Sequence, residues 1–302
     1  MEKNTKISKF LFVIRLFWTW TVKIYLIIIY FMDREKTMVL VLDIDGTLTN
    51  SKKEITERTK NAVIDTMKRG HKVILASGRP TYGMHRYEKE LELKENGGFL
   101  LSFNGGRIVD CTSGRVVYQK TLPKQVIPRL YDFAIDNDCG LITYENENII
   151  LGTRMDDYIG IESRINGMEV KKVENFVEYV DFDVNKCLMT ALPEKAEKYV
   201  ELLQEEFGDI LSIYRSEPFF IEIMPKNIDK AKSLDRMLSS VGLYRENTIC
   251  CGDGYNDISM IQYAGIGVAM ENAQEKVKDS ADFITRSNDM DGIVVVIDKF
   301  IE

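Results

Sequence analysis

The apolar run at positions 38–42 ends directly in two aspartates, and this stretch restricts the fold more than any other in the chain. The segment reads Met-Val-Leu-Val-Leu, followed by Asp43-Ile-Asp45-Gly46-Thr. An apolar run of this length, ending in turn residues, is typical of a strand that is buried on both faces. In open parallel α/β sheets, ligands bind beside the carboxyl ends of such strands. We therefore expect Asp43 and Asp45 at a ligand-binding edge, with Gly46 letting backbone N–H groups approach an anion.

Taken alone, the two aspartates fit three kinds of local structure. The first is a solvated turn between two strands. The second is a calcium-binding loop, but that loop needs glycine at its sixth position and a helix on each side. Leu48 occupies the sixth position and a strand precedes the loop, so we exclude this alternative. The third is a nucleophilic aspartate beside an acid/base aspartate, together with Mg²⁺. The first and third alternatives remain open until the rest of the chain is considered.

A second strand is expected at 72–76, after a helix at 54–70. This alternation of strand, helix and strand implies a parallel sheet with right-handed crossovers. The second strand ends in Ser77-Gly78, so these residues belong at the same edge of the sheet as Asp43. A hydroxyl followed by glycine can hold a phosphate group there. Ser77 is also a candidate N-cap for the helix that follows, and the two roles are compatible.

The last part of the chain returns to alternating helices and strands. A helix is expected to begin at Lys230, and a strand at 247–251 is followed by Asp253. Asp257 lies about one helical turn further on, so that both carboxylates can face one point. Considered individually, such acids are more often solvated turn residues than ligands.

The middle of the chain, at 123–225, has a different pattern. One amphipathic helix is expected at 194–207, and Glu222 on the last strand is a candidate to face the site. Many strands with few helices predict a separate α+β unit with an antiparallel sheet. The expected strands lie at 140–144, 149–151, 186–191, 210–215 and 219–224.

The ordered set of motifs resembles the haloacid dehalogenase (HAD) superfamily, and more narrowly the Cof-type phosphatases with a type C2 cap. The resemblance extends from Met38 to Glu302 and implies an α/β fold, with a Rossmann-like HAD core, a parallel sheet and an inserted α+β cap domain. The core would comprise 38–122 and 226–302, and the cap 123–225. The motifs that carry the resemblance are Asp43-Ile-Asp45-Gly-Thr, Ser77-Gly-Arg, Lys230 and Gly-Asp253-Gly-Tyr-Asn256-Asp257.

The resemblance also implies roles for individual residues. Asp43 would be the nucleophile that forms an aspartyl-phosphate, and Asp45 the residue that protonates the leaving oxygen and then activates water. The proton donor must be protonated at the right moment, so we expect carboxylate neighbours and partial burial to raise the pKa of Asp45. The implied ligands of Mg²⁺ are Asp43, Asp45 through its backbone carbonyl, Asp253 and Asp257. The implied phosphate-binding residues are Ile44, Ser77, Gly78, Lys230 and Asn256. The sequence around Lys230 departs from the family pattern, so Lys226 and Lys232 are alternatives.

The predicted function is a Mg²⁺-dependent hydrolase of phosphomonoesters that acts on a small phosphorylated metabolite, such as a sugar phosphate. Alternatives are a phosphotransferase or phosphomutase on the same fold, and a regulatory protein without catalytic activity. The net charge of −7 argues against a nucleic-acid partner. Five cysteines without C-x-x-C spacing favour a reducing compartment, and hence the cytoplasm. No feature of the sequence predicts an oligomeric state.

Residues 1–37 do not share the pattern of the rest. The stretch 10–31 is mostly apolar and long enough for a membrane span, but Arg15 and Lys23 interrupt it. Two interpretations remain open, a membrane anchor and a spurious upstream extension before a true start at Met32 or Met38. An anchor with its N-terminus inside would place the enzyme outside the cytoplasm, which conflicts with the unpaired cysteines.

Deleting residues 1–37 is expected to leave a folded, active protein, because this segment contributes neither a motif nor a strand of the predicted core. Circular dichroism and a phosphatase assay on the truncated chain would test this. An unfolded or inactive product would mean that the segment belongs to the domain.

Overall fold

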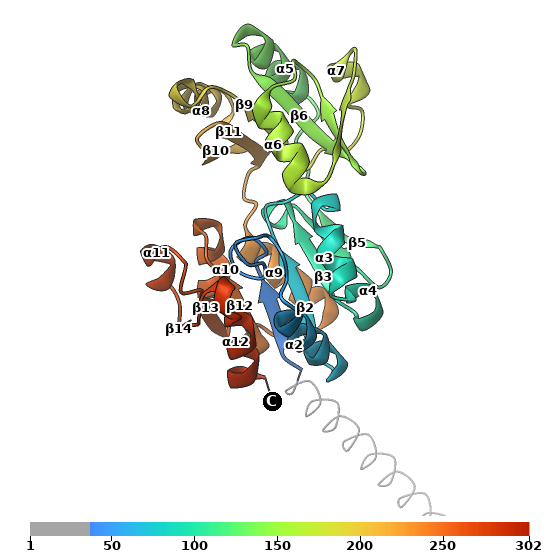
Figure 1. The fold of residues 1–302 in the computed structure, drawn as a ribbon. Helices are drawn as coiled ribbons and strands as arrows, with labels where there is room; N and C mark the ends of the chain where they lie inside the picture. Colours follow the sequence, from blue (N-terminus) through green and yellow to red (C-terminus); the bar gives the residue numbers. More distant parts are fainter. Residues whose placement is uncertain (1–36, 302) are drawn as a thin grey trace, which may run out of the picture. The chain divides into compact units, whose positions relative to one another are not determined.

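The computed structural model describes residues 37–301, and these residues form two β-sheets, one of eight strands and one of six (Figure 1). The apolar stretch 10–31 lies outside the described residues. None of the helices in the described part has the length and hydropathy of a membrane-spanning segment.

The larger sheet contains the strand that was expected to carry the two aspartates. β1 (Val39–Leu42) lies between β2 and β12 and pairs with both in parallel. Parallel pairing continues outward to β14 on one side and to β3 on the other, and only the last two strands, β4 and β5, pair in antiparallel fashion. The predicted α/β class with a parallel sheet is therefore confirmed. The order is β14 (Phe283–Ile284), β13 (Ile266–Ala269), β12 (Thr248–Gly252), β1, β2 (Lys72–Ala76), β3 (Phe99–Ser102), β4 (Arg107–Asp110) and β5 (Val116–Gln119).

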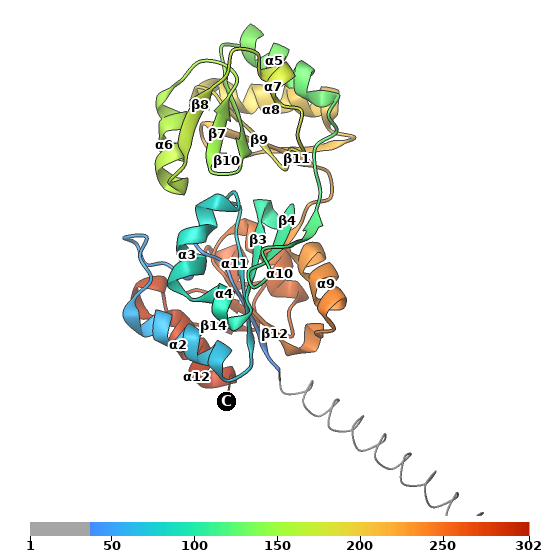
Figure 2. The ribbon, with the colours of Figure 1, turned by 90° about the vertical axis from the view of Figure 1, so that its right-hand side faces the viewer.

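Helices cover both faces of this sheet (Figure 2). Val39 and Val41 of β1 pack into a cluster with α9 and α10, and every residue of the strand is fully buried. Burial on both faces explains why β1 is an uninterrupted apolar run. On the other face, α2 packs beside α12. The helices of this part are α2 (Glu57–Lys68), α3 (His85–Glu90), α4 (Leu93–Asn96), α9 (Lys230–Val241), α10 (Ile258–Tyr263), α11 (Glu275–Lys278) and α12 (Gly292–Phe300), with short 3₁₀ turns η1 (Tyr82–Met84), η2 (Phe103–Gly105), η3 (Arg245–Asn247), η4 (Tyr255–Asp257) and η5 (Asn288–Met290).

Helix α2 is shorter than the expected 54–70. It begins after Thr56, whose side-chain oxygen accepts a hydrogen bond from the backbone N–H of Thr59 at 3.1 Å. This cap satisfies a backbone donor of the first turn and fixes the start of the helix. Gly70 follows the helix with φ +93, a conformation that favours glycine.

The smaller sheet lies in the middle of the chain, between β5 and α9 in sequence order. Its pairings are antiparallel except for β7 with β8. The expectation of few helices was wrong, because four helices accompany this sheet. The strand order is β10 (Leu211–Glu217), β11 (Phe220–Pro225), β9 (Cys187–Thr190), β6 (Gly140–Glu145), β7 (Asn148–Leu151) and β8 (Glu169–Lys172), and the helices are α5 (Val126–Asp136), α6 (Asp157–Asn166), α7 (Phe176–Tyr179) and α8 (Pro193–Phe207).

Two apolar clusters lie on opposite faces of the smaller sheet. One contains Leu130 of α5 and Leu203 of α8, and the other contains Ile159 of α6. The missed strand β8 is mostly exposed and rich in charged residues, so it lacks the apolar alternation by which strands are recognised.

The turn η2 approaches the start of α9 through Gly105. This residue has φ +97, and a Cβ atom there would lie 2.6 Å from Ser233 Oγ and 3.0 Å from the Asp229 carbonyl oxygen. Ser233 Oγ also donates a hydrogen bond to the Gly105 carbonyl at 2.9 Å. The absence of a side chain at Gly105 thus lets η2 pack directly against the first turn of α9.

We expect Gly105→Ala to lower the free energy of unfolding by about 2–4 kcal/mol, from the left-handed backbone and the overpacking together. Gly114→Ala is a matched control, because Gly114 has φ +68 but an added Cβ atom would meet no other group within 4 Å. Its cost should be only about 1 kcal/mol, from the backbone alone. Urea unfolding of both variants measures the difference, and equal costs would show that η2 and α9 can separate freely.

Candidate active site

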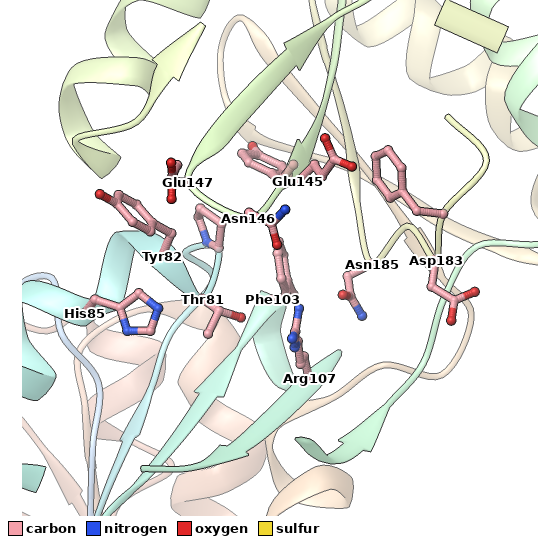
Figure 3. A pocket seen from close by; sticks show the side chains of 13 residues that line it. Thr81, Tyr82, His85, Phe103, Arg107, Glu145, Asn146, Glu147, Asp183 and Asn185 are labelled. Carbon is pink, nitrogen blue, oxygen red and sulfur yellow. The ribbon is translucent and has the colours of Figure 1, made fainter. Parts of the chain in front are cut away.

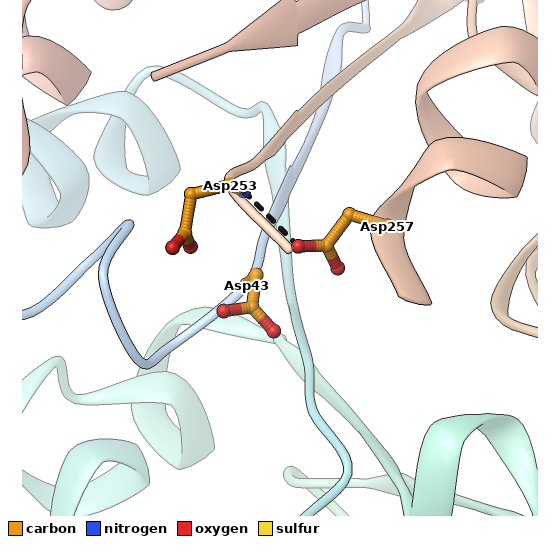
Figure 4. A group of neighbouring side chains, drawn as sticks. All are labelled: Asp43, Asp253 and Asp257. Atoms are coloured by element: carbon orange, nitrogen blue, oxygen red, sulfur yellow. Dashed lines mark hydrogen bonds between the residues drawn. The ribbon is translucent and has the colours of Figure 1, made fainter. Parts of the chain in front are cut away.

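Three carboxylates converge at the carboxyl edge of the larger sheet (Figure 4). Asp43 follows β1 and Asp253 follows β12, the neighbouring parallel strand. Asp257 comes from the turn η4, and its Oδ2 accepts hydrogen bonds from the backbone N–H groups of Asp253 at 3.1 Å and Gly254 at 2.9 Å. One oxygen from each of the three carboxylates lies within 4.8 Å of the others. The structure thus brings together Asp43 and Asp253, which follow neighbouring strands, and Asp257, as expected from the sequence.

Lys230 is the cation at this cluster. Its Nζ donates to Asp43 Oδ1 at 2.7 Å, to Asp257 Oδ1 at 2.6 Å and to the Ala76 carbonyl at 3.0 Å. All three donors of the ammonium group are therefore used, and the side chain is only 1% exposed.

Of the three lysines considered from the sequence, only Lys230 contacts the cluster. Asp229 caps α9 by accepting a hydrogen bond from the Lys232 backbone N–H, which places Lys230 at the first helical position. Lys232 is exposed, and Lys226 donates to the Gly208 carbonyl instead.

The cluster contains more negative than positive charge. Burial raises the pKa of Asp43 well above its usual range, and the charge of Asp257 adds to this effect while Lys230 opposes it. Burial also raises the pKa of Asp253 to about 6, although the hydrogen bond from Thr47 acts to lower it. Burial alone would lower the pKa of Lys230, but Asp257 and Asp43 outweigh it and raise that pKa above its ordinary value.

Gly46 and Thr47 hold Asp253 in place. Thr47 Oγ1 donates to Asp253 Oδ1 at 2.8 Å. A Cβ atom at Gly46, which has φ +86, would lie 2.3 Å from Asp253 Oδ2. Glycine is therefore required here both for the backbone conformation and for the close approach of the carboxylate.

Asp45 has a different environment from the other three aspartates. Arg79 donates from Nε to Oδ2 at 2.7 Å and from Nη2 to Oδ1 at 2.8 Å, and Lys53 Nζ lies 3.0 Å from Oδ1. Burial would raise the pKa of Asp45, but the hydrogen bonds and charges of Arg79 and Lys53 outweigh it and lower the pKa to about 2. The expected increase was wrong, because nothing in the sequence indicates that Arg79, 34 residues away, binds this carboxylate.

Ser77 and Gly78 form the loop after β2. The Ser77 backbone N–H donates to the Leu101 carbonyl at 2.9 Å, and its Oγ accepts from the Arg79 backbone N–H at 3.2 Å. Ser77 does not cap the next helical turn, because the N-cap of η1 is Thr81. Ile44 is fully buried, so its side chain is not available at this edge.

Asn256 connects the site to the smaller sheet through two further side chains. Its Nδ2 donates to Asn104 Oδ1 at 3.1 Å, and Asn104 Nδ2 donates to the Tyr214 hydroxyl at 3.1 Å. Asn104 also lies beside Gly78, where a Cβ atom would be 3.3 Å from its side chain. Asn256, Gly78 and the strand β10 therefore meet around Asn104.

A family model for haloacid dehalogenase-like hydrolases matches residues 40–297. The chain belongs to this family. A solved haloacid dehalogenase-like hydrolase from Bacteroides thetaiotaomicron superposes with a TM-score of 0.85 at 42% identity, covering 87% of this chain and 99% of that one. A structure described as a HAD subclass IIB sugar phosphatase has a TM-score of 0.74 at 28% identity, covering 87% and 99%. The Bacillus subtilis protein 5-amino-6-(5-phospho-D-ribitylamino)uracil phosphatase YcsE is 27% identical over 86% of this chain and 94% of its own length. These findings confirm the superfamily and the phosphatase class expected from the motifs.

In this HAD-type chain, one face of the smaller sheet carries a charged pair that the sequence analysis largely missed. Lys186 Nζ lies 3.0 Å from Glu222 Oε2, 3.5 Å from the Gly78 carbonyl and 5.1 Å from the centre of the Tyr144 ring. Ser216 donates to the other oxygen of Glu222 at 2.9 Å. The sequence indicates only Glu222 as a candidate, because a lysine before an apolar strand gives no sign of being buried. Lys186 is 3% exposed and Glu222 8%.

A cavity of about 520 Å³ lies next to these residues (Figure 3). Thr81 and Tyr82 line it from the segment after Gly78, Glu145 from the end of β6 and Glu147 from the turn that follows. None of the three clustered aspartates lines this cavity. The cavity therefore does not include the aspartate cluster. The remaining lining residues are Pro80, His85, Phe103, Arg107, Tyr144, Asn146, Phe182, Asp183 and Asn185.

Asp253→Asn is expected to stabilise the protein in the absence of divalent cations by about 2–3 kcal/mol at pH 8. The pKa of Asp253 is raised from 3.8 to about 6 in the folded state. Its charged form therefore destabilises the fold above pH 6, and this penalty disappears as the pH falls towards 4. Urea unfolding at pH 8 and pH 4 would measure the gain and its loss.

Asp289→Asn is the control, because the pKa of Asp289 is shifted in the opposite direction. Hydrogen bonds from Ser51 lower the pKa of the exposed Asp289, so its replacement should not stabilise the protein at pH 8. A stabilisation by Asp253→Asn that persists at pH 4 would contradict the electrostatic cause.

Proposed function

We propose that the protein hydrolyses phosphomonoesters of small metabolites with the help of Mg²⁺, through an aspartyl-phosphate on Asp43. The observation that supports this most directly is the buried contact of 2.7 Å between Asp43 and Lys230, beside Asp253 and Asp257. A carboxylate can approach a phosphate dianion only where positive charge offsets their repulsion. Lys230 supplies such a charge next to the attacking oxygen.

The proposed reaction has two steps. An oxygen of Asp43 attacks phosphorus, and the bond between phosphorus and the ester oxygen breaks while Asp45 gives its proton to that oxygen. A water molecule then attacks the phosphorus of the aspartyl-phosphate, Asp45 takes a proton from this water, and phosphate leaves with Asp43 restored.

The contacts of Asp45 impose a requirement on the first step. Its carboxylate is paired with Arg79 and Lys53, and its pKa is about 2. The ionised carboxylate can accept the proton of water in the second step. To donate a proton, Asp45 must first lose its hydrogen bond to Arg79 or to Lys53. The contact with Lys53 is the more easily lost, because the Lys53 side chain is 57% exposed.

The donor set fits Mg²⁺. Carboxylate oxygens of Asp43, Asp253 and Asp257 lie within 4.8 Å of one another, and hard oxygen ligands are those that Mg²⁺ prefers. The raised pKa of Asp253 supports the presence of a cation, since Lys230 alone does not offset the negative charge. The backbone carbonyl of Asp45 would complete the protein ligands. When bound, the ion neutralises charge on the carboxylates and the phosphoryl group.

Four other groups would hold the phosphoryl oxygens opposite Asp43. These are the Ser77 hydroxyl, the Gly78 and Ile44 backbone N–H groups, and the Asn256 amide. Ser77 supports this role because it is only 3% exposed yet lies at the same strand-end edge as Asp43. Asn256 supports it through its link to Asn104 beside Gly78.

We further propose that 123–225 act as a cap over a core formed by 38–122 and 226–302. The smaller sheet has its own apolar clusters, which is typical of a separate unit.

The five cysteines are free and buried, which supports a reducing compartment such as the cytoplasm.

The polar side chains around Lys186 and Glu222 favour a neutral, hydroxylated leaving group. Lys186 and Glu222 neutralise each other, so neither a cationic nor an anionic group would find an unpaired opposite charge there. Together with the Tyr144 and Tyr214 hydroxyls they offer donors and acceptors suited to a sugar or polyol. The relative described as a sugar phosphatase supports the same substrate class.

Two substitutions should separate the roles of the aspartates. Asp43→Asn removes the nucleophile, so no phosphoenzyme should form with any substrate. Asp45→Asn should form it rapidly from nitrophenyl phosphate, whose leaving group needs no proton, and then stall because water is not activated. With a sugar phosphate the first step should also slow, by up to ~10²–10⁴-fold. Rapid-quench measurement of phosphoenzyme with both substrates tests this. Phosphoenzyme in Asp43→Asn, or equal losses for both substrates in Asp45→Asn, would overturn the assignment.

A further inference from the structure

We propose that Arg79 couples the docking of helix α6 to the orientation of the Asp45 carboxylate. Arg79 is then a positioning residue that acts through Asp45. The inference rests on the proposed function, in which Asp45 transfers protons in both steps.

The Arg79 guanidinium binds both partners at once. Nε and Nη2 donate to the two oxygens of Asp45, and Nη1 donates to the Ile165 carbonyl at 2.5 Å. The fork geometry of a guanidinium fixes the plane of the carboxylate it binds. The Arg79 side chain is 7% exposed, and its guanidinium lies 5.7 Å from the centre of the Tyr87 ring. Arg79 thus holds Asp45 in one orientation.

The third partner comes from the end of α6, in the segment that carries the smaller sheet. Ile165 lies in the last turn of this ten-residue helix, where carbonyl groups lack intrahelical donors and attract cations. The hydrogen bond spans 86 residues of sequence. It can exist only while the end of α6 lies against the segment that follows Ser77 and Gly78.

A close contact next to Arg79 fixes this docked arrangement. A Cβ atom at Gly83, in η1, would lie 2.4 Å from Asn166 Oδ1 and 3.2 Å from Asn166 Cβ. Asn166 is the last residue of α6 and is buried, and its Oδ1 accepts no hydrogen bond within residues 37–301. Gly83 and the Asn166 side chain therefore contact each other by close packing rather than by a hydrogen bond. Glycine at position 83 allows this approach.

Docking and Asp45 orientation are linked as a result. With α6 docked, the guanidinium is fixed at all three of its bonding nitrogens. When α6 moves away, Nη1 loses its acceptor, and Arg79 and Asp45 can rotate together. The structure thus makes the proton-transferring group fully ordered only when the segment carrying the smaller sheet lies in place.

The first test replaces Arg79 in the full-length chain by Lys and by Gln. Impaired positioning of Asp45 should give a normal burst with nitrophenyl phosphate, a steady-state rate lowered by about 10–10²-fold and accumulated phosphoenzyme. KM should fall together with kcat, because the slowed step follows formation of the phosphoenzyme. Arg79→Lys should be affected less than Arg79→Gln, because it keeps the charge but not the fork. A purely structural role would lower stability without accumulation of phosphoenzyme.

The second test disturbs docking without touching Arg79 or Asp45. Gly83→Ala places a methyl group against Asn166, so it should also slow dephosphorylation and accumulate phosphoenzyme. Gly83→Ala combined with Asn166→Ala should restore most of the rate, because the clashing amide is removed. Gly160→Ala is the matched control on α6, where the nearest atom to a new Cβ is the flexible Arg164 Nη1 at 3.3 Å, and it should behave as the wild type.

The two hypotheses fail in different ways. A wild-type steady-state rate without accumulated phosphoenzyme in Arg79→Gln, or in Gly83→Ala, would overturn the coupling while leaving the phosphatase assignment intact. If the wild-type protein forms no phosphoenzyme from either nitrophenyl phosphate or a hexose phosphate, the proposed function fails, and the coupling that rests on it falls as well.

Discussion

The hydrogen bonds of the Lys230 ammonium are the interaction on which the rest of the site depends. They join Asp43 after β1, the Ala76 carbonyl at the end of β2 and Asp257 in η4, in a position that water does not reach. A buried charge is tolerated only when it is paired and fully hydrogen-bonded. The Lys230 ammonium is placed by the first turn of α9, by the Asp229 cap and by the contact at Gly105. The excess of carboxylates around it destabilises the empty protein, and the Mg²⁺ proposed above would offset this cost.

Much of the larger sheet could be predicted because its strands obey simple rules. β1 and β2 are apolar runs that end in polar residues, and a parallel sheet brings those ends to one edge. The positions of Asp43 and Asp253 follow from this geometry. Lys230 was expected only from the family resemblance, with Lys226 and Lys232 as alternatives. The contacts of Asp45 do not, because an ion pair between side chains distant in sequence leaves no periodic pattern. Lys186 and Glu222 were hard to recognise for the same reason, as charged residues usually indicate exposure.

Polar contacts connect the two sheets, in addition to the packing of Phe103 against Tyr144. Arg79 reaches the Ile165 carbonyl, Lys186 approaches the Gly78 carbonyl, and Asn104 contacts Tyr214. Such contacts exchange with water more readily than an apolar interface does, so they would allow the proposed cap to separate from the core. The helices α5, α6 and α7, which the sequence analysis did not anticipate, include the one that supplies the carbonyl for Arg79.

The order of strands in the larger sheet has a consequence for how the chain folds. β1 at the centre must pair with β12, yet the whole of the smaller sheet lies between them in the chain. During synthesis, β1 to β5 therefore emerge long before their remaining partner, with one side of β1 unpaired. Collapse of the intervening segment brings β5 and α9 closer together and reduces the entropy lost on closing this loop. The segment proposed to select the substrate would then also assist late folding, and slow, stepwise refolding is the expected behaviour of such a topology.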